Sequence, residues 1–141
     1  TPDEKRRVQL HPLVSADLAA QVTYFRGDIE KIIRHHHEHV NGTGYPHGLT
    51  GDEIPLGSRI ILIADAFDAM TSNRMYRSAL DLTRVKNEFV KYAGTQFDPV
   101  LVPIFLSQCV PDDSAVIPQI DIPYEELLST QLRTAEAASA M

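Results

Sequence analysis

Three consecutive histidines, His35, His36 and His37, are followed by Glu38 and then by a glycine-rich loop. Neutral imidazole is the commonest metal ligand in proteins, and a cluster of imidazoles adds little to a hydrophobic core. Glycines such as Gly42 let the backbone bend sharply beside a bound ligand. The pattern therefore indicates a metal-assisted hydrolase.

The spacing of the histidines favours more than one metal ion. Adjacent residues on a helix point about 100° apart, so one ion rarely takes both His36 and His37. Two ions roughly 3.5–4 Å apart can take one ring each, and such centres suit in-line attack on phosphoryl groups. Asp65 is the expected carboxylate partner, because it lies among Ile and Ala residues in the run Ile60–Ala69, where an unpaired charge is costly. His11, at a predicted helix start, is a further candidate ligand.

Each of these assignments has a plainer alternative. Histidines at the end of a helix also suit a solvated surface patch that the helix dipole favours. Asp65 alternatively pairs with Arg59 or Arg74. Glu38 either orients a histidine from behind the metal or lies in solvent. The two remaining histidines are expected at the surface or at the rim of the site: His39 and His47.

The hydrophobic periodicity predicts an all-α fold, with no repeat and no alternating strand pattern. Pro55-Leu56 opens the most apolar helix, whose run Ile60–Ala64 is expected to be buried on most sides. The segment 110–123 contains three prolines and is predicted to be extended, and a last helix is predicted from Tyr124. The most apolar helix spans about 57–71. The remaining predicted helices span about 1–10, 11–25, 28–37, 82–93 and 99–109, and 40–57 is an irregular loop.

Composition narrows the class of protein. A chain of 141 residues suits one ordinary core. Cys109 is the single cysteine, which rules out an internal disulfide and favours a reducing, cytoplasmic setting. No apolar run is long enough to span a membrane. A net charge of −6 argues against DNA as a partner, although metal ions can make one pocket locally positive.

Ordered motifs along the chain resemble the HD-GYP domain, a branch of the HD metal-dependent phosphohydrolases. The resemblance covers about residues 1–110 and leaves 111–141 as a C-terminal extension made of a linker and a helix. It implies an HD-domain-like helical bundle that hydrolyses the bacterial second messenger cyclic di-GMP to linear pGpG or GMP. The motifs that carry it are His11-Pro12, His36-His37-Glu38, Asn41–Pro46, Gly48-Leu49, Ile54–Leu56, Arg59-Ile60, Ala64–Ser72, Arg74, Tyr76-Arg77, Gly94 and Phe97–Pro99.

The resemblance also implies the parts of a site. Two or three divalent ions are expected, iron or manganese first, with zinc, nickel or magnesium as alternatives. Arg74 and Arg77 are expected to hold the substrate phosphates. Glu38 and Asp68 are expected to support the ligands from behind. The implied metal ligands are His11, His36, His37 and Asp65, and the implied lip of the pocket is formed by Gly44, Tyr45 and Pro46.

The chain departs from the family pattern at several positions. Asn41 stands where an Asp is usual, His39 where an Arg is common, and Met75 where a Pro is usual. The family's His-Asp dyad and the Lys that follows it would precede Thr1, so no catalytic proton donor is assigned. If residues 1–141 are the whole molecule, weak metal binding and little turnover are expected; if they belong to a longer chain, an active phosphodiesterase is expected.

The family resemblance implies partners besides cyclic di-GMP. It implies a sensor or receiver domain in the same bacterial signalling chain, as in two-component systems, and GGDEF cyclase domains that dock on the Gly44–Pro46 loop. Self-association into a homodimer is a further option. The competing hypothesis is a catalytically inactive module that binds cyclic di-GMP or docks a GGDEF domain. The pair His36-His37 together with Asp65 favours the enzyme.

Overall fold

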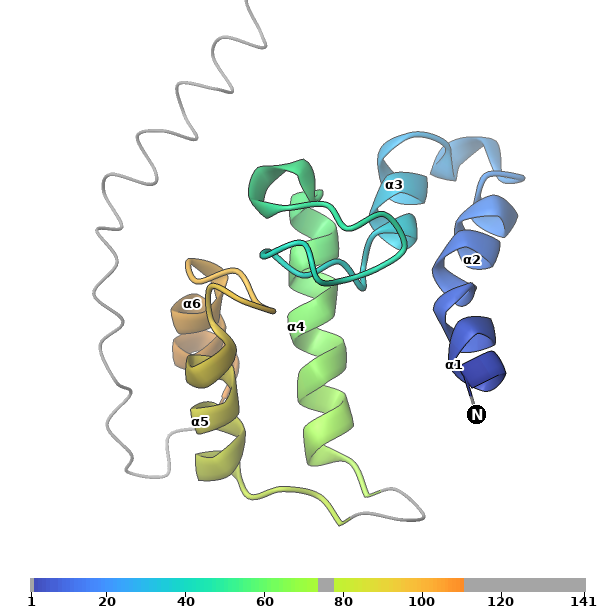
Figure 1. Cartoon of the computed structure of the whole chain (residues 1–141). Helices are drawn as coiled ribbons and strands as arrows, with labels where there is room; N and C mark the ends of the chain where they lie inside the picture. The colour runs from blue at the N-terminus through green and yellow to red at the C-terminus, as the bar shows by residue number, and fades with distance from the viewer. Residues whose placement is uncertain (1, 74–77, 111–141) are drawn as a thin grey trace, which may run out of the picture.

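Helix α4 (Leu56–Thr71) occupies the middle of Figure 1, with α1 (Pro2–Gln9) and α2 (His11–Ala19) on one side. This computed structural model describes residues 2–73 and 78–110. Within these residues all regular elements are helices, and β pairing is limited to isolated bridges between single residue pairs. The predicted all-α class is therefore confirmed. The other described elements are η1 (Thr23–Phe25), α3 (Asp28–Arg34), η2 (Gly51–Glu53), α5 (Leu82–Tyr92) and α6 (Leu101–Cys109).

Helix α3 packs against both α2 and α4, and so links the N-terminal helices to the rest of the fold. Its contact with α4 is close at Gly57, where an added Cβ would lie 2.6 Å from Ile32 Cδ1. The adjacent Ser58 hydroxyl donates a hydrogen bond of 2.8 Å to the Ile32 carbonyl oxygen. The end of α3, from which the histidines follow, is therefore held against the first turn of α4.

The hydrophobic core lies between α4, α5 and α6. Phe89 of α5 is fully buried, and its ring centroid lies 5.4 Å from that of Phe105 on α6. Aromatic pairs at this separation add to the stabilisation from burial alone. The other buried members of the cluster are Leu62, Ile63, Val85, Phe97, Val102, Leu106 and Val110.

An ion pair joins α4 to the start of α6. Arg59 donates to the Asp98 carboxylate across 2.7 Å, and both side chains are nearly buried. The other carboxylate oxygen of Asp98 accepts hydrogen bonds from the backbone N–H groups of Val100 and Leu101. Asp98 therefore holds the turn that leads into α6, whose first helical residue is Leu101.

The expectation that the Ile60–Ala64 run is buried on most sides is wrong. Leu62 and Ile63 are buried, but Ile60 is 49% exposed and Ile61 is 40% exposed. Residues three or four apart share one face of a helix, so only one face of α4 can point at the core. In the described part of the chain, α5 and α6 cover that single face.

One further expectation is wrong, and several others concern residues that the structure does not describe. Helix α2 ends at Ala19 rather than near Phe25, because Val22 is extended and Thr23–Phe25 forms a separate short turn of 3-10 helix. The predicted extended segment beyond Val110, the helix from Tyr124, and both Arg74 and Arg77 lie outside the described residues. The division of the chain at residue 110 stays a prediction.

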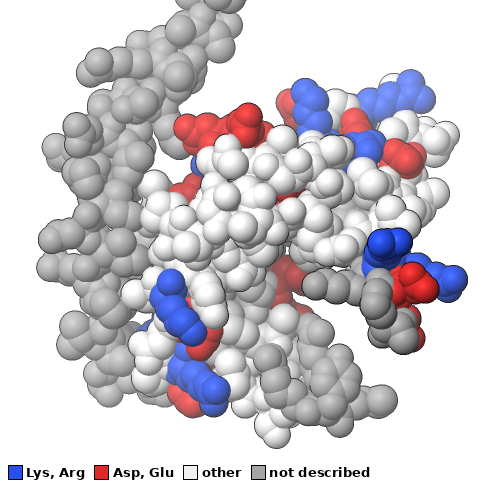
Figure 2. Space-filling model, viewed as in Figure 1, with Lys and Arg blue, Asp and Glu red and all other residues white. Residues whose placement is uncertain are grey.

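The surface is not uniformly charged. On the face drawn in Figure 2, uncharged residues cover most of the middle, and acidic and basic side chains gather mainly around its margin. No described helix is both long and apolar enough to cross a lipid bilayer.

Candidate metal centre

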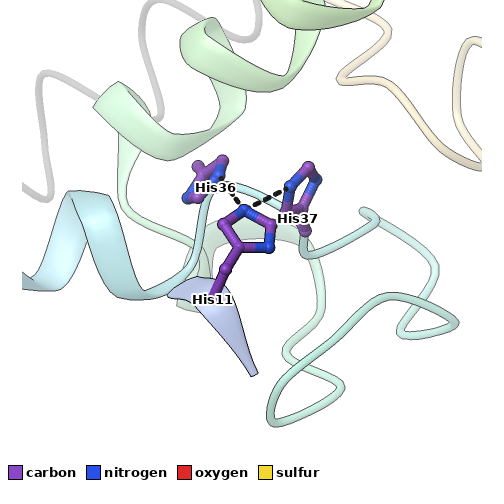
Figure 3. A group of neighbouring side chains, drawn as sticks. All are labelled: His11, His36 and His37. Carbon is purple, nitrogen blue, oxygen red and sulfur yellow. Dashed lines mark hydrogen bonds between the residues drawn. The ribbon is translucent and has the colours of Figure 1, made fainter. Parts of the chain in front are cut away.

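Three histidine rings from two separate elements converge on one point (Figure 3). His11 is the first residue of α2, whereas His36 and His37 follow the end of α3. The Nε2 atom of His11 lies 3.3 Å from that of His36 and 3.1 Å from that of His37. One ligand atom from each ring lies within 4.8 Å of the other two, a spacing that fits one shared metal ion. The prediction that one ion rarely takes both His36 and His37 assumed a helix that runs to residue 37, but α3 ends at Arg34 and both histidines lie in the turn after it.

Two of these rings, His11 and His36, are oriented so that their Nε2 lone pairs could bind a cation. The Nδ1 atom of His11 lies 2.6 Å from the Val8 carbonyl oxygen, and that of His36 lies 2.6 Å from the Ile33 carbonyl oxygen. A carbonyl oxygen only accepts, so each Nδ1 carries the proton and each Nε2 of the neutral ring presents a lone pair. Two lone pairs facing each other repel unless a cation or a proton lies between them. A backbone carbonyl that holds the outer N–H of a metal-binding histidine is also the usual support for such a ligand.

The chain fixes this convergence through the packing of α3 on α2. Arg34, the last residue of α3, forms an ion pair of 2.8 Å with Asp17 of α2 and a second, of 2.6 Å, with Glu30. After Arg34 the backbone leaves the helix, and the Glu38 N–H donates to the His35 carbonyl oxygen in a turn. His36 and His37 are thereby carried toward the start of α2, where His11 begins its helix.

His37 is held in its neutral form. Burial, followed by the neighbouring His36 and His11, lowers the pKa of His37 to about 4, and the negative charge of Asp65 only partly opposes this. Desolvation penalises the charged imidazolium more than the neutral ring. At neutral pH the ring therefore carries a free lone pair, which is the form that binds metals.

Asp65 is near the cluster but does not belong to the three-histidine group. It lines a cavity of about 310 Å³ together with His37 and His39. The expectation that it is buried is wrong, because it lies on the exposed side of α4. The alternative pairing with Arg59 is also not formed, since Arg59 binds Asp98 and Asp52 instead.

The Gly44–Pro46 segment lies directly against the histidines. The Tyr45 ring stacks on the His37 ring, with centroids 4.9 Å apart and planes 27° apart. The Tyr45 N–H donates to the His37 carbonyl oxygen across 3.1 Å. Gly44 passes so close to the preceding backbone that an added Cβ would lie 2.6 Å from Glu38 Cα. Tyr45 therefore packs on a candidate ligand, and the Tyr45-Pro46 peptide that follows is cis.

Glu38 holds the loop rather than a ring nitrogen in the described structure. It is 1% exposed, so the alternative of a solvated Glu38 is wrong. One carboxylate oxygen accepts from the His47 N–H at 2.7 Å, and the other accepts from the Leu49 N–H at 3.0 Å. Asp68, the other predicted supporting acid, is exposed on α4 and accepts a hydrogen bond from the Ser72 hydroxyl.

Sequence reasoning missed the far wall of the cavity. Glu88 and Tyr92 of α5, and Gln96 beyond it, face the same space as His37 and Asp65. Their positions follow from how α5 packs on α4, and no local motif marks them. His39, predicted at the rim, lines this cavity, and its Nδ1 lies 3.1 Å from the Thr43 hydroxyl oxygen.

Several known proteins are similar to this chain in sequence. Over 104 residues the chain is 36% identical to a cyclic di-GMP phosphodiesterase of Vibrio cholerae, covering 74% of this chain and 21% of that protein. Over 108 residues it is 36% identical to the cyclic di-GMP phosphodiesterase response regulator RpfG of Xanthomonas campestris, covering 75% of this chain and 28% of that protein.

A solved structure gives a matching fold. The crystal structure of a cyclic GMP-AMP specific phosphodiesterase of V. cholerae superposes with a TM-score of 0.53 and 33% identity, over 65% of this chain and 20% of that one. The matched part of the chain thus spans between 20% and 28% of the length of these proteins. Residues 1–101 match the HD domain family. The chain therefore belongs to the HD domain family, as its HD-GYP motifs predicted.

Proposed function

We propose that this chain is part of a metal-dependent phosphodiesterase that hydrolyses cyclic di-GMP to linear pGpG or GMP. The observation that carries the proposal is the convergence of the His11, His36 and His37 rings, two of them with their lone pairs turned inward. The names of two relatives that are 36% identical over the matched residues support the same reaction.

The residues that would hold metal ions are His11, His36 and His37, and we propose Asp65 as a further ligand from the adjacent cavity wall. Bound divalent ions polarise phosphoryl oxygens and lower the pKa of a bound water to about 7. Iron and manganese are the metals proposed from the family resemblance, and mixed imidazole and carboxylate ligation suits them as it does zinc.

The charge of the cavity explains why cations are needed for this substrate. Asp65 and Glu88 both line the cavity, and its described lining contains no lysine or arginine. A phosphodiester anion that approached this wall would be repelled by the two carboxylates. Metal ions held by the three histidines would reverse the local sign, and the predicted phosphate contacts of Arg74 and Arg77 would add to that effect.

The chain's own residues would do three things in the reaction. The carbonyl oxygens of Val8 and Ile33 orient two rings, and the ion pair of Arg34 with Asp17 keeps α3 beside α2. Burial keeps His37 neutral. The Tyr45 ring covers one face of His37 at the mouth of the site. Together these contacts preorganise the ligands, so little reorganisation is required when metal and substrate bind.

We also propose that the chain is the output part of a signalling protein, since one relative is named a response regulator. Docking of a GGDEF domain on the Gly44–Pro46 loop, and self-association, stay predictions from the resemblance.

The experiment measures hydrolysis of cyclic di-GMP by the purified full-length protein loaded with Mn²⁺ or Fe²⁺. His36→Ala is expected to lose more than the roughly 10–100-fold typical of residues that merely support a ligand. Ser15→Ala, an exposed substitution on the helix that begins with His11, is the control and should retain activity. Binding of cyclic di-GMP without turnover in the metal-loaded protein would instead establish the inactive module. Faster hydrolysis of 3′3′-cGAMP in a parallel reaction would overturn the choice of substrate alone.

A further inference from the structure

A second group of side chains of the types that bind metals lies near the first and shares no residue with it. One ligand atom each from His35, Glu38 and His47 lies within 4.8 Å of the other two. The ring centroids of His35 and His47 are 5.2 Å apart, although the two residues are separated by the whole Gly44–Pro46 loop. The group therefore joins the end of α3 to the far side of that loop.

The His35 ring is oriented as a ligand. Its Nδ1 lies 2.8 Å from the Lys31 carbonyl oxygen, which can only accept, so Nδ1 carries the proton. Nε2 of the neutral ring is left with a lone pair. His11 and His36 show the same arrangement in the first cluster, with Nδ1 held by a backbone carbonyl.

The Glu38 carboxyl group is buried, and its described hydrogen-bond partners carry no charge. It is 1% exposed, and the donors recorded for its oxygens are the uncharged N–H groups of His47 and Leu49. A carboxylate has about four lone-pair sites, so these two bonds leave room for a further interaction. A buried carboxylate is costly unless a positive charge accompanies it, and a metal ion would supply that charge.

We propose that His35, Glu38 and His47 form a second divalent-metal site, which takes a zinc-like ion and fastens the loop to the end of α3. Two histidines and one glutamate are a known set of three protein ligands for zinc, with a fourth position left for water. The proposal does not depend on the phosphodiesterase activity. Its mechanical consequence is local: His47 follows Pro46 directly, so an ion bound here would restrain the segment that places Tyr45 on His37.

The test counts metal ions in the full-length protein, using Zn²⁺ as the probe and elemental analysis after removal of unbound metal. The double variant His35→Ala/His47→Ala is expected to hold one equivalent of Zn²⁺ fewer than the wild type. His11→Ala, which disrupts the first cluster, is expected to keep that equivalent. Equal zinc content in the wild type and the double variant would overturn the proposal.

A second arm separates ligation from packing. His47→Ala should weaken the Zn²⁺ affinity of this site by at least the roughly 10–100-fold seen when only supporting residues are removed. His47→Cys replaces one zinc ligand by another, so it should bind the equivalent of Zn²⁺ that His47→Ala loses. Zn²⁺ should also slow hydrogen exchange at the Leu49 amide in the wild type and in His11→Ala. Failure of His47→Cys to restore binding, with all variants folded by circular dichroism, would refute His47 as a ligand.

Discussion

Gly44→Ala is predicted to damage the metal centre without removing any ligand. The added Cβ would lie 2.5 Å from the His37 carbonyl oxygen and 2.6 Å from Glu38 Cα, and neither backbone atom can rotate away. The loop must therefore shift. Overpacking of this kind costs about 1–3 kcal/mol of unfolding free energy. The shift would also separate Tyr45 from His37, because the N–H of Tyr45 donates to the His37 carbonyl oxygen at 3.1 Å.

Gly51→Ala is the matched control in the same connection. Gly51 has a positive φ of 45°, but an added Cβ there meets nothing within 4 Å. The control should cost about 1–2 kcal/mol from the left-handed backbone alone. It should leave the Mn²⁺ affinity unchanged, since it does not move Tyr45 or His37.

The assay pairs urea unfolding with Mn²⁺ titration for the wild type and both variants. Gly44→Ala should lower both the unfolding free energy and the metal affinity, whereas Gly51→Ala should lower only the first. If Gly44→Ala binds Mn²⁺ as tightly as Gly51→Ala, the loop does not support the histidines and the reasoning fails.

Three further changes have defined outcomes. Glu38→Gln should cost about 1–3 kcal/mol in urea unfolding, because the amide nitrogen of Gln cannot accept a hydrogen bond and so leaves one of the two loop N–H groups unpaired; an unchanged midpoint would contradict the role of Glu38 in holding the loop. Arg34→Met should lower the Mn²⁺ affinity while costing only about 0.2–1 kcal/mol of stability, since its pair with Asp17 is exposed on one side; unchanged affinity would refute its role in placing α3. Hydrogen bonds from Thr50 lower the pKa of Glu53, so this carboxylate stabilises the fold above its unfolded pKa and loses that effect as the pH falls through its folded pKa. An NMR titration should find that pKa below its usual value and raised toward it in Thr50→Ala, which removes the hydroxyl donor but keeps the backbone N–H; equal values in both proteins would exclude the Thr50 hydroxyl as a cause of the shift.

The predictable parts of the site are those that depend on local sequence. His11 before Pro12 predicts a helix start, and the structure begins α2 there. The glycine-rich loop after the histidines predicts close backbone contact, and Gly44 makes it. These features depend only on residues that are neighbours along the chain, so the sequence predicts them without knowledge of the fold.

The rest depends on which helix faces meet. Asp65 looks buried in sequence, because its neighbours are apolar, but one face of α4 stays open in the described structure. The position of Glu88 in the cavity wall depends on how α5 packs against α4. The pairing of His35 with His47 needs the loop to fold back around Glu38, and no spacing rule predicts that closure.

The most direct test of the three-histidine centre is anomalous diffraction from crystals of the full-length protein grown with Mn²⁺. The predicted result is an anomalous peak about 2.0–2.2 Å from ring nitrogens of His11, His36 and His37, the distance typical of metal–imidazole bonds. A fully loaded crystal whose metal peaks all lie elsewhere, with these three rings bound only to one another, would contradict the proposed centre.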